Sequence, residues 1–344
     1  MSGANMRGRT SAILSAIGLG LLALAACKPA SEAPKAAGAP NAVETPEEPA
    51  SLDWAYAVNP PGAPAEPDAV TVHHIPNSSA GFTMKQARDL SNVPDWRPDS
   101  HPKMPDVVAH GRKPGVFACG FCHYPTGTGR PENASLAGLS IGYIAGQMAD
   151  MKNGLRTNAV KARGPGNGML TIAKAASDAD IDAAARYFSA MTPKPFGKVV
   201  EAADVPKTKV ASWVYAPDPA GGTEKLGQRI VEMTEDLTRF DLRDDLTPIT
   251  AYVPVGSVKR GETLVMIGDG HNKICAECHS GNFKGIGDVP PIAGRSPSYI
   301  ARQLSDFRSG ARTGMRADPM KDVVAKMTDR DIMAIAAYLG TLEP

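Results

Sequence analysis

The sequence has few aromatic residues, almost no net charge and only five cysteines. These shortages limit how a core can be filled and which partners the protein can bind. Aromatic side chains make up 6% of the 344 residues, so other groups must fill part of any core. The formal net charge of +1 gives no basic footprint of the kind that nucleic-acid binding needs, and we expect no nucleic-acid partner. Glycine and proline are frequent instead, with 34 and 30 residues, which indicates long loops and linkers. The length predicts two domains, or one domain with additions.

The sequence begins with a short uncharged stretch rather than one that would comfortably span a membrane. Residues 11–26 carry no charge and follow Arg7 and Arg9. A membrane span needs about 20 apolar residues. A basic start, an apolar middle and a small-residue end are typical of an export signal, so we predict a signal peptide over residues 1–26.

The end of this signal, residues 24–27, resembles the lipobox of bacterial lipoproteins. The resemblance implies that Cys27 becomes the first mature residue and carries a lipid that binds the membrane. The alternative is an ordinary signal peptide with Cys27 incidental. Because Lys28 stands where an aspartate would favour the inner membrane, we expect a periplasmic protein anchored to the outer membrane. Residues 27–51 are rich in Ala, Pro and Glu and predict a disordered tether.

The other four cysteines form two copies of one motif, Cys-x-x-Cys-His, over residues 119–123 and 275–279. This pattern attaches c-type haem: two thiols add across the vinyl groups, and the histidine turns its imidazole onto the iron. A thioredoxin-like site would need a strand–helix–strand context, a zinc site would need pairs closer than 156 residues, and a disulfide would not need the histidine. We therefore predict two c-type haems. The residues that bind them are Cys119, Cys122, His123, Cys275, Cys278 and His279.

The two motifs lie within a longer duplication. Residues 119–157 align without a gap with residues 275–313, and 15 of the 39 positions are identical. A period of 156 residues is too long for a solenoid, so we predict two homologous domains. Apolar residues at helical spacing predict a helix after each motif, on Ile144, Met148 and Met151 and on Ile300, Leu304 and Phe307. Ser177 and Thr328 are good caps for a final helix in each domain.

The run from Cys275 to Leu339 resembles a class I c-type cytochrome, and the pair of repeats resembles the two-haem subgroup of that family. The likeness covers roughly residues 104–192 and 256–342. It implies a mainly α fold with two tandem class I cytochrome c helical domains. We place them at residues 104–200 and 255–344, with an N-terminal extension at 52–103 and an irregular or β-leaning connector at 201–254.

The resemblance also implies a methionine on the far side of each iron. Met169 and Met320 each lie eight residues ahead of the cap of the last helix, so we expect His123 and Met169 to bind one iron and His279 and Met320 the other. We expect both methionines in loops, with the longer and more glycine-rich loop in the first domain. The rivals are Met315, Met327 and Met333 in the second domain, and His101 and His110 near the first motif.

One departure from the family pattern concerns the histidine of each motif. In the family, a proline carbonyl accepts a hydrogen bond from it, and the segment that begins at Pro291 resembles that loop. The first domain has Ser135 at the corresponding position, so the rigid proline is lost although a carbonyl remains. The two haems could therefore differ in potential.

The extension and the connector carry weaker signals. His73 and His74 form a pair that could bind a metal, but nothing nearby completes a ligand set, so we expect an exposed loop. Two runs, Arg229–Met233 and Ile249–Val255, favour strands, and a helix start at Gly261 is expected to lead into the second domain.

The function that fits best is electron transfer outside the cytoplasm, one electron per haem, with no enzymatic role. The expected partners are a periplasmic dehydrogenase as donor and a cytochrome or oxidase as acceptor. The alternative is a two-haem enzyme such as a peroxidase or a thiosulfate-oxidising cytochrome, which would need an exchangeable ligand on one iron. A third possibility is a cytochrome subunit held in a larger oxidoreductase.

Overall fold

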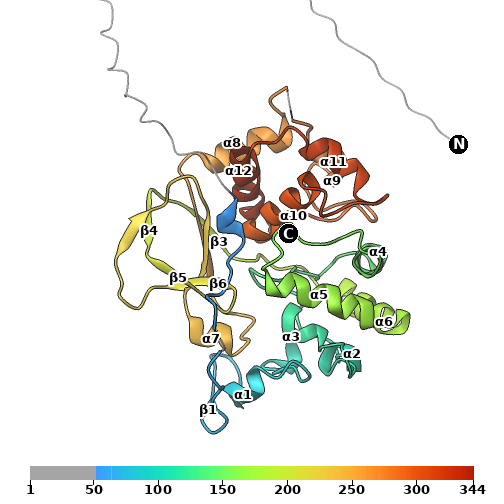
Figure 1. Ribbon diagram of the computed structural model, residues 1–344, viewed down its shortest axis with the longest axis vertical. Helices are drawn as coiled ribbons and strands as arrows, with labels where there is room; N and C mark the ends of the chain where they lie inside the picture. Colours follow the sequence, from blue (N-terminus) through green and yellow to red (C-terminus); the bar gives the residue numbers. More distant parts are fainter. Residues whose placement is uncertain (1–51, 63, 271) are drawn as a thin grey trace, which may run out of the picture. The chain divides into compact units, whose positions relative to one another are not determined.

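The structure of the protein is a computed structural model that describes residues 52–62, 64–270 and 272–344 (Figure 1). These residues belong to one compact unit, which spans Glu48–Pro344. The signal peptide, the lipid on Cys27 and the tether lie outside the described residues. In the part of the chain that is described, no helix has the length and apolar character needed to cross a membrane.

The first group of helices follows the first motif. Its members are α3 (Cys119–His123), α4 (Ile141–Lys152), α5 (Gly164–Ala175) and α6 (Asp178–Ser189). α4 begins where the Ser140 side chain accepts a hydrogen bond from the Tyr143 amide. Ile144 of α4 packs with Ala185 and Phe188 of α6 in one core. This confirms the predicted helices around Ile144 and after Ser177.

The second group repeats this plan. It consists of α8 (Ser257–Met266), α9 (Ala276–His279), α10 (Pro297–Arg308), α11 (Asp318–Val324) and α12 (Asp329–Gly340). Both final helices begin with a capping box, Ser177 with Asp180 and Thr328 with Asp331. α8 begins at Ser257, so the expected helix start at Gly261 was wrong. Gly261 lies inside α8, where a Cβ atom would come within 2.0 Å of the Ala334 carbonyl oxygen of α12. Glycine permits this close helix approach.

The segment between the two groups, predicted to be irregular or β-leaning, is a regular β structure, so its β character is confirmed and its predicted irregularity was wrong. We call residues 198–253 the inserted module. Its larger sheet has the strand order β3-β9-β8-β6-β5, and β4 pairs with β7 in a small second sheet. The bounds are β3 (Lys198–Glu201), β4 (Asp204–Pro206), β5 (Thr208–Ala211), β6 (Val214–Pro217), β7 (Thr223–Lys225), β8 (Val231–Thr234), α7 (Leu237–Asp241) and β9 (Ile249–Val253). β8 and β9 confirm the two predicted strand runs.

The sequence missed the module's other strands because most are short and partly exposed. β3, β5 and β7 span three or four residues and present exposed or half-buried side chains throughout. Such strands carry little of the alternating pattern on which sequence-based detection depends. They are held by pairing with neighbouring strands: β3 with β9, β5 with β6 and β7 with β4.

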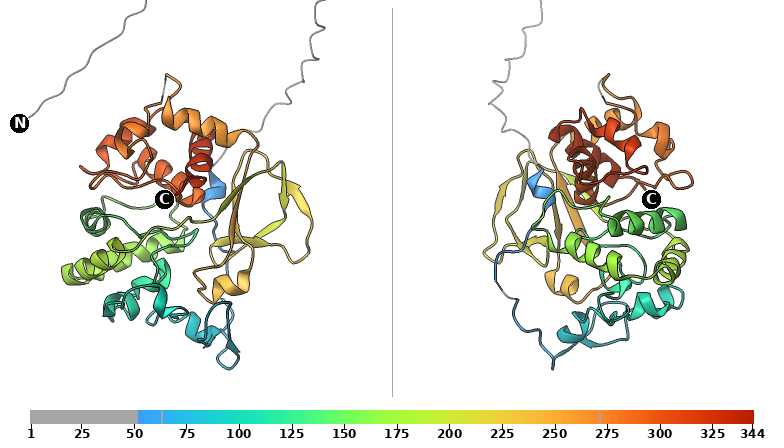
Figure 2. Two further views of the ribbon diagram at one scale, coloured as in Figure 1. Left: turned by 180° about the vertical axis from the view of Figure 1, so that it is seen from behind. Right: turned by 45° about the vertical axis from the view of Figure 1, so that its right-hand side comes forward.

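The N-terminal extension consists of short elements. These are η1 (Asp53–Ala55), β1 (Val72–His73), β2 (Phe82–Thr83), α1 (Met84–Ala87) and η2 (Pro98–Ser100); α2 (Asp106–Ala109) follows the extension and packs in the core of the first helical group. Trp54 and Ala55 belong to the core of the second helical group. Trp96 packs beside the inserted module, because its indole N–H donates a hydrogen bond of 2.7 Å to the Leu242 carbonyl. Both views in Figure 2 show the extension next to α7. The extension therefore contacts both the second helical group and the module.

Candidate functional site

The first Cys-x-x-Cys-His motif forms the single short helix α3. The Nδ1 atom of His123 lies 2.7 Å from the Ala134 carbonyl oxygen and donates a hydrogen bond to it. Burial lowers the pKa of His123, so the ring is neutral at pH 7. With the proton on Nδ1, Nε2 carries the free lone pair that a metal needs.

A cavity of about 570 Å³ lies beside this helix. Its lining includes Cys119, Cys122, His123 and Met169. The structure thus brings together all four residues that the sequence assigned to the first haem. Burial raises the pKa of the Cys119 thiol to about 12. A neutral thiol in apolar surroundings suits a thioether link better than a metal-bound thiolate.

Met169 is not in a loop as predicted. It lies on α5, half-buried, five residues after the first residue of that helix. The helix forms in a glycine-rich sequence because Pro165 lies in its first turn and tertiary contacts outweigh low propensity. The rival histidines do not line the cavity. His101 lies 3.2 Å from Asp95, and the Nδ1 atom of His110 lies 3.0 Å from the Asn92 carboxamide oxygen.

The second motif has the same local geometry. The Nδ1 atom of His279 lies 2.8 Å from the Pro290 carbonyl oxygen, and burial lowers the pKa of His279. Pro290 and Ala134 occupy equivalent positions in the repeat. The proline carbonyl is therefore present in the second site and replaced by that of alanine in the first, although the acceptor is Pro290 and not Pro291.

Among the methionines of the second site, Met320 differs from its rivals. It is half-buried against the core, whereas Met315 is 91% exposed and Met327 and Met333 are fully packed. Met320 lies on α11, so the predicted loop is here a short helix as well. Met320 is therefore the one of the four that is neither fully buried nor fully exposed.

Comparisons with known proteins show to which family the chain belongs. The model of the Cytochrome c family matches residues 259–343. Cytochrome c4 from Azotobacter vinelandii is 36% identical over 144 residues, which cover 38% of this chain and 68% of that protein. The chain belongs to the two-haem c-type cytochromes.

Further relatives cover more of the cytochrome. A thiosulfate dehydrogenase electron acceptor from Thiomonas intermedia is 28% identical over 232 residues, 66% of this chain and 79% of that protein. The crystal structure of reduced recombinant cytochrome c4 from Pseudomonas stutzeri covers 65% of the chain and 93% of its own, with 26% identity and a TM-score of 0.41. The cofactors of the cytochrome are two c-type haems.

The residues of the cytochrome fit this cofactor. The first cavity provides two thiols, an imidazole with a free Nε2 and a thioether around one apolar space. It also holds two cationic side chains whose Nε atoms have no hydrogen-bond partner, Arg163 and Arg243. Burial lowers the pKa of Arg163 to about 9 and that of Arg243 to about 10, so both stay charged at pH 7. Neither residue could be predicted from the sequence, because nothing in its local pattern marks it.

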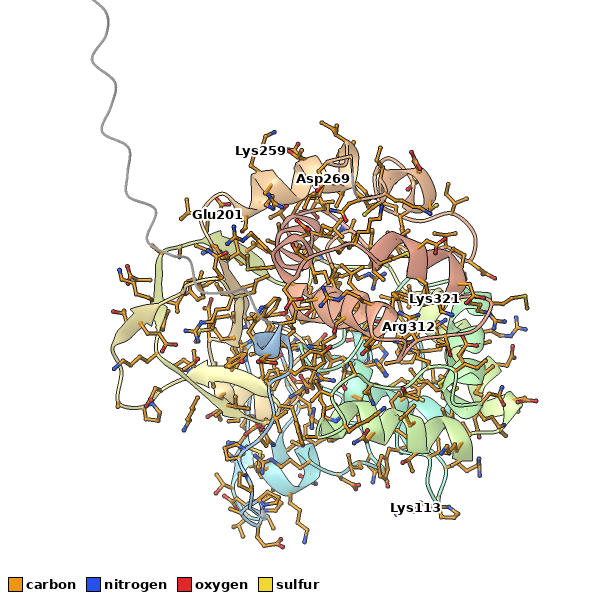
Figure 3. The ribbon with its side chains drawn as sticks, turned by 45° about the horizontal axis from the view of Figure 1, so that its top comes forward. Lys113, Glu201, Lys259, Asp269, Arg312 and Lys321 are labelled. Carbon is orange, nitrogen blue, oxygen red and sulfur yellow. The ribbon has the colours of Figure 1, made fainter. Side chains whose placement is uncertain are left out.

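The two halves of the cytochrome meet through residues that the duplication conserved in both repeats. The Gln147 carboxamide oxygen accepts from Arg156 at 2.8 Å and from Arg312 at 2.7 Å. The Gln303 carboxamide oxygen accepts from the same two arginines at 2.8 and 3.0 Å. Figure 3 shows Arg312 where the second helical group meets the first.

The backbone completes this two-fold arrangement. The Thr157 amide donates to the Ala311 carbonyl, and the Thr313 amide donates to the Leu155 carbonyl, each at 2.7 Å. These identical residues reveal the repeat in the sequence, but their structural role is visible only in the fold. The signal was present, since the identical polar residues Gln147, Arg156 and Thr157 lie outside the haem motif.

Proposed function

We propose that the chain is an electron carrier with two haems, each held by one Cys-x-x-Cys-His motif and one methionine. The first haem would be bound by Cys119, Cys122, His123 and Met169. The second would be bound by Cys275, Cys278, His279 and Met320. The observation that carries the proposal is the repetition of one geometry, in which each motif histidine donates from Nδ1 to an equivalent backbone carbonyl.

Each protein group has a definite part in this proposal. The covalently bound haems supply one-electron chemistry, in which iron alternates between the ferrous and ferric states. The backbone carbonyls of Ala134 and Pro290 hold the two imidazole rings and leave Nε2 free to bind iron. A methionine thioether favours ferrous iron and raises the potential. One imidazole and one thioether at each site would hold the haem iron from the protein side.

Electron transfer between redox partners is the function that membership of this family carries. The relatives are named as cytochromes or as an electron acceptor, which supports a carrier and not an enzyme. A peroxidase would need an iron with an open position, and the half-buried methionine at each site opposes this. We propose a dehydrogenase as electron donor, of the kind that the thiosulfate dehydrogenase electron acceptors serve by name.

We propose further that the chain acts outside the cytoplasm. The basic start and the apolar stretch of residues 11–26 support export, and the lipobox supports a lipid on Cys27 and attachment to the outer membrane. Haem is attached to such motifs after export, so the location and the cofactor are consistent.

Two measurements on the full chain test the ligand assignment. After expression with haem-maturation machinery, the intact mass should rise by two haems. Oxidised protein should show the weak charge-transfer band near the red end of the visible spectrum that methionine–iron bonding gives. Met320→His and Met169→His should each remove part of this band and lower one potential, because imidazole favours ferric iron more than a thioether does. Met315→His is the matched control and should leave the band intact. A loss of the band in that control would move the ligand to Met315.

A further inference from the structure

The two haem motifs have equivalent positions in the repeat but opposite surroundings. In the first, residues 120–132 are buried apart from Cys122 and Thr128, which are half-buried. In the second, the equivalent residues 276–288 are mostly exposed, and Cys278 itself is exposed. The same face of the same fold is therefore covered in one half of the protein and open in the other.

Part of the inserted module, α7 and the residues that follow it, packs over the first motif. The Arg243 guanidinium stacks on the Phe121 ring at 3.9 Å. The Arg130 guanidinium stacks on the Phe240 ring at 3.6 Å and donates to the Phe240 carbonyl at 3.0 Å. These contacts close the side of the motif that carries Phe121, next to Cys122.

The N-terminal extension closes the same motif from another direction. The Ala118 amide donates to the Leu90 carbonyl at 2.9 Å. At Gly120, a Cβ atom would meet the Val93 side chain and the Val108 carbonyl, each at 3.1 Å. Glycine at this position therefore relieves a close contact with Val93 of the extension.

Ion pairs join the N-terminal extension to the inserted module, and we call these two parts together the cover. Arg97 of the extension contacts Asp244 at 2.9 Å and Asp245 at 2.6 Å. Arg88 of the extension contacts Asp241 at 2.8 Å. The side chain of Asp244 is completely inaccessible to solvent, so the extension and the module form one continuous layer.

The variable positions of the two Cys-x-x-Cys-His motifs differ in the way that burial of the first and exposure of the second would favour. Phe121 is buried beneath Arg243, whereas its repeat partner Glu277 is exposed to solvent. Beyond Glu277, the open face includes Lys284 and Ile286, the latter 65% exposed. An aromatic residue under a cover and a carboxylate on a free surface are what burial and exposure respectively favour.

We propose that the second site is the port through which electrons enter and leave the protein, and that the first haem exchanges electrons only by way of the second. This rests on the proposed function. The physical reason is distance, because the rate of electron tunnelling falls exponentially with the separation of donor and acceptor. The cover keeps an external partner away from the Cys122 edge. α10 of the second helical group links the sites, since Tyr299 and Gln303 line the first cavity.

The test measures electron exchange between the reduced holoprotein and hexacyanoferrate(III), an anion that accepts one electron and becomes hexacyanoferrate(II). Each reduced protein gives two electrons to two such ions, one from each ferrous haem. Reagent is kept dilute, so that exchange between the haems is faster than each encounter. Glu277→Gln and Glu277→Lys change the charge beside Cys278 by one and two units. The matched control is Thr238→Lys, which adds one charge on the exposed surface of α7 in the cover.

If the second site is the port, both one-electron steps should accelerate several-fold at low salt, more in Glu277→Lys than in Glu277→Gln. The effect should fade as salt is raised, because exposed charges are screened. Lys284→Glu should slow both steps, and Thr238→Lys should leave both unchanged. An acceleration of either step in Thr238→Lys, or no response to Glu277, would overturn the port assignment. Wild-type protein that does not take up two electrons reversibly would instead overturn the proposed function.

Discussion

Replacing Asp244 with alanine should loosen the cover from the first haem site. The Asp244 carboxylate has no solvent exposure and accepts three separate interactions. Arg97 contacts it at 2.9 Å, Arg239 at 2.6 Å, and the Leu246 amide donates to it at 3.0 Å. The substitution removes one negative charge from a place where two positive charges converge.

The size of the expected loss in free energy depends on the contacts and solvent exposure that the two arginines keep after the substitution. Removing one member of a buried ion pair costs about 3–5 kcal/mol, because the other charge stays buried without compensation. Here Arg97 keeps Asp245 at 2.6 Å, and the side chains of Arg97 and Arg239 are 12% and 23% exposed. We therefore expect a loss of about 2–3 kcal/mol in the free energy of opening the cover.

Tryptophan fluorescence can report the opening directly. Trp213 lines the first cavity, so haem bound there quenches it in the closed protein, and emission rises when the module moves away. The midpoint urea concentration of this increase in emission should be lower by about 1 M in Asp244→Ala than in the wild type, given ordinary denaturant slopes. Asp182→Ala is the control, since it also removes a carboxylate but from an exposed pair within α6. Equal behaviour of the two variants would refute the view that Asp244 fastens the cover.

Three other predictions concern the second helical group, the extension and the anchor. Gly261→Ala should lower the free energy of unfolding by about 1–3 kcal/mol, because its Cβ would press on the Ala334 carbonyl of α12; thermal melting measures this, and an unchanged melting temperature would contradict it. The hydrogen bond to Asp95 raises the pKa of His101, so its contribution to stability is complete below about pH 6.5 and is lost as pH rises through the higher folded pKa. His101→Gln should remove that decline from a pH series of urea midpoints, and a decline that persists would assign it to another group. Cys27→Ala should release the protein from membranes on fractionation, whereas continued binding would show another anchor.

The haem sites could be predicted from the sequence because their chemistry is local. Cysteines and histidine must stand at fixed spacing to bond one haem, so the motif shows the site without any knowledge of the fold. The position in the repeat and the family resemblance together then point to Met169 and Met320 as the second ligands. The setting of these methionines was wrong, since both lie on helices. Glycine-rich and proline-containing segments look like loops, and only the packing around α5 and α11 makes them helical.

The cover could not be predicted, because it depends on contacts between residues far apart in the chain. Arg243 and Phe121 are brought together only by the fold, and neither has a local pattern that points to the other. The difference between Phe121 and Glu277 was visible in the sequence. Its meaning required the structure, in which the same position is buried once and exposed once.

A reductive titration of the full-length holoprotein tests the central claim most directly. Stepwise addition of a one-electron reductant under argon, followed by visible spectra, should show two electrons taken up and returned reversibly by each chain. Both haems should remain low-spin throughout, with no change on adding cyanide or peroxide. Uptake of a single electron, or a high-spin haem that binds cyanide readily, would contradict two methionine-ligated haems and favour an enzyme.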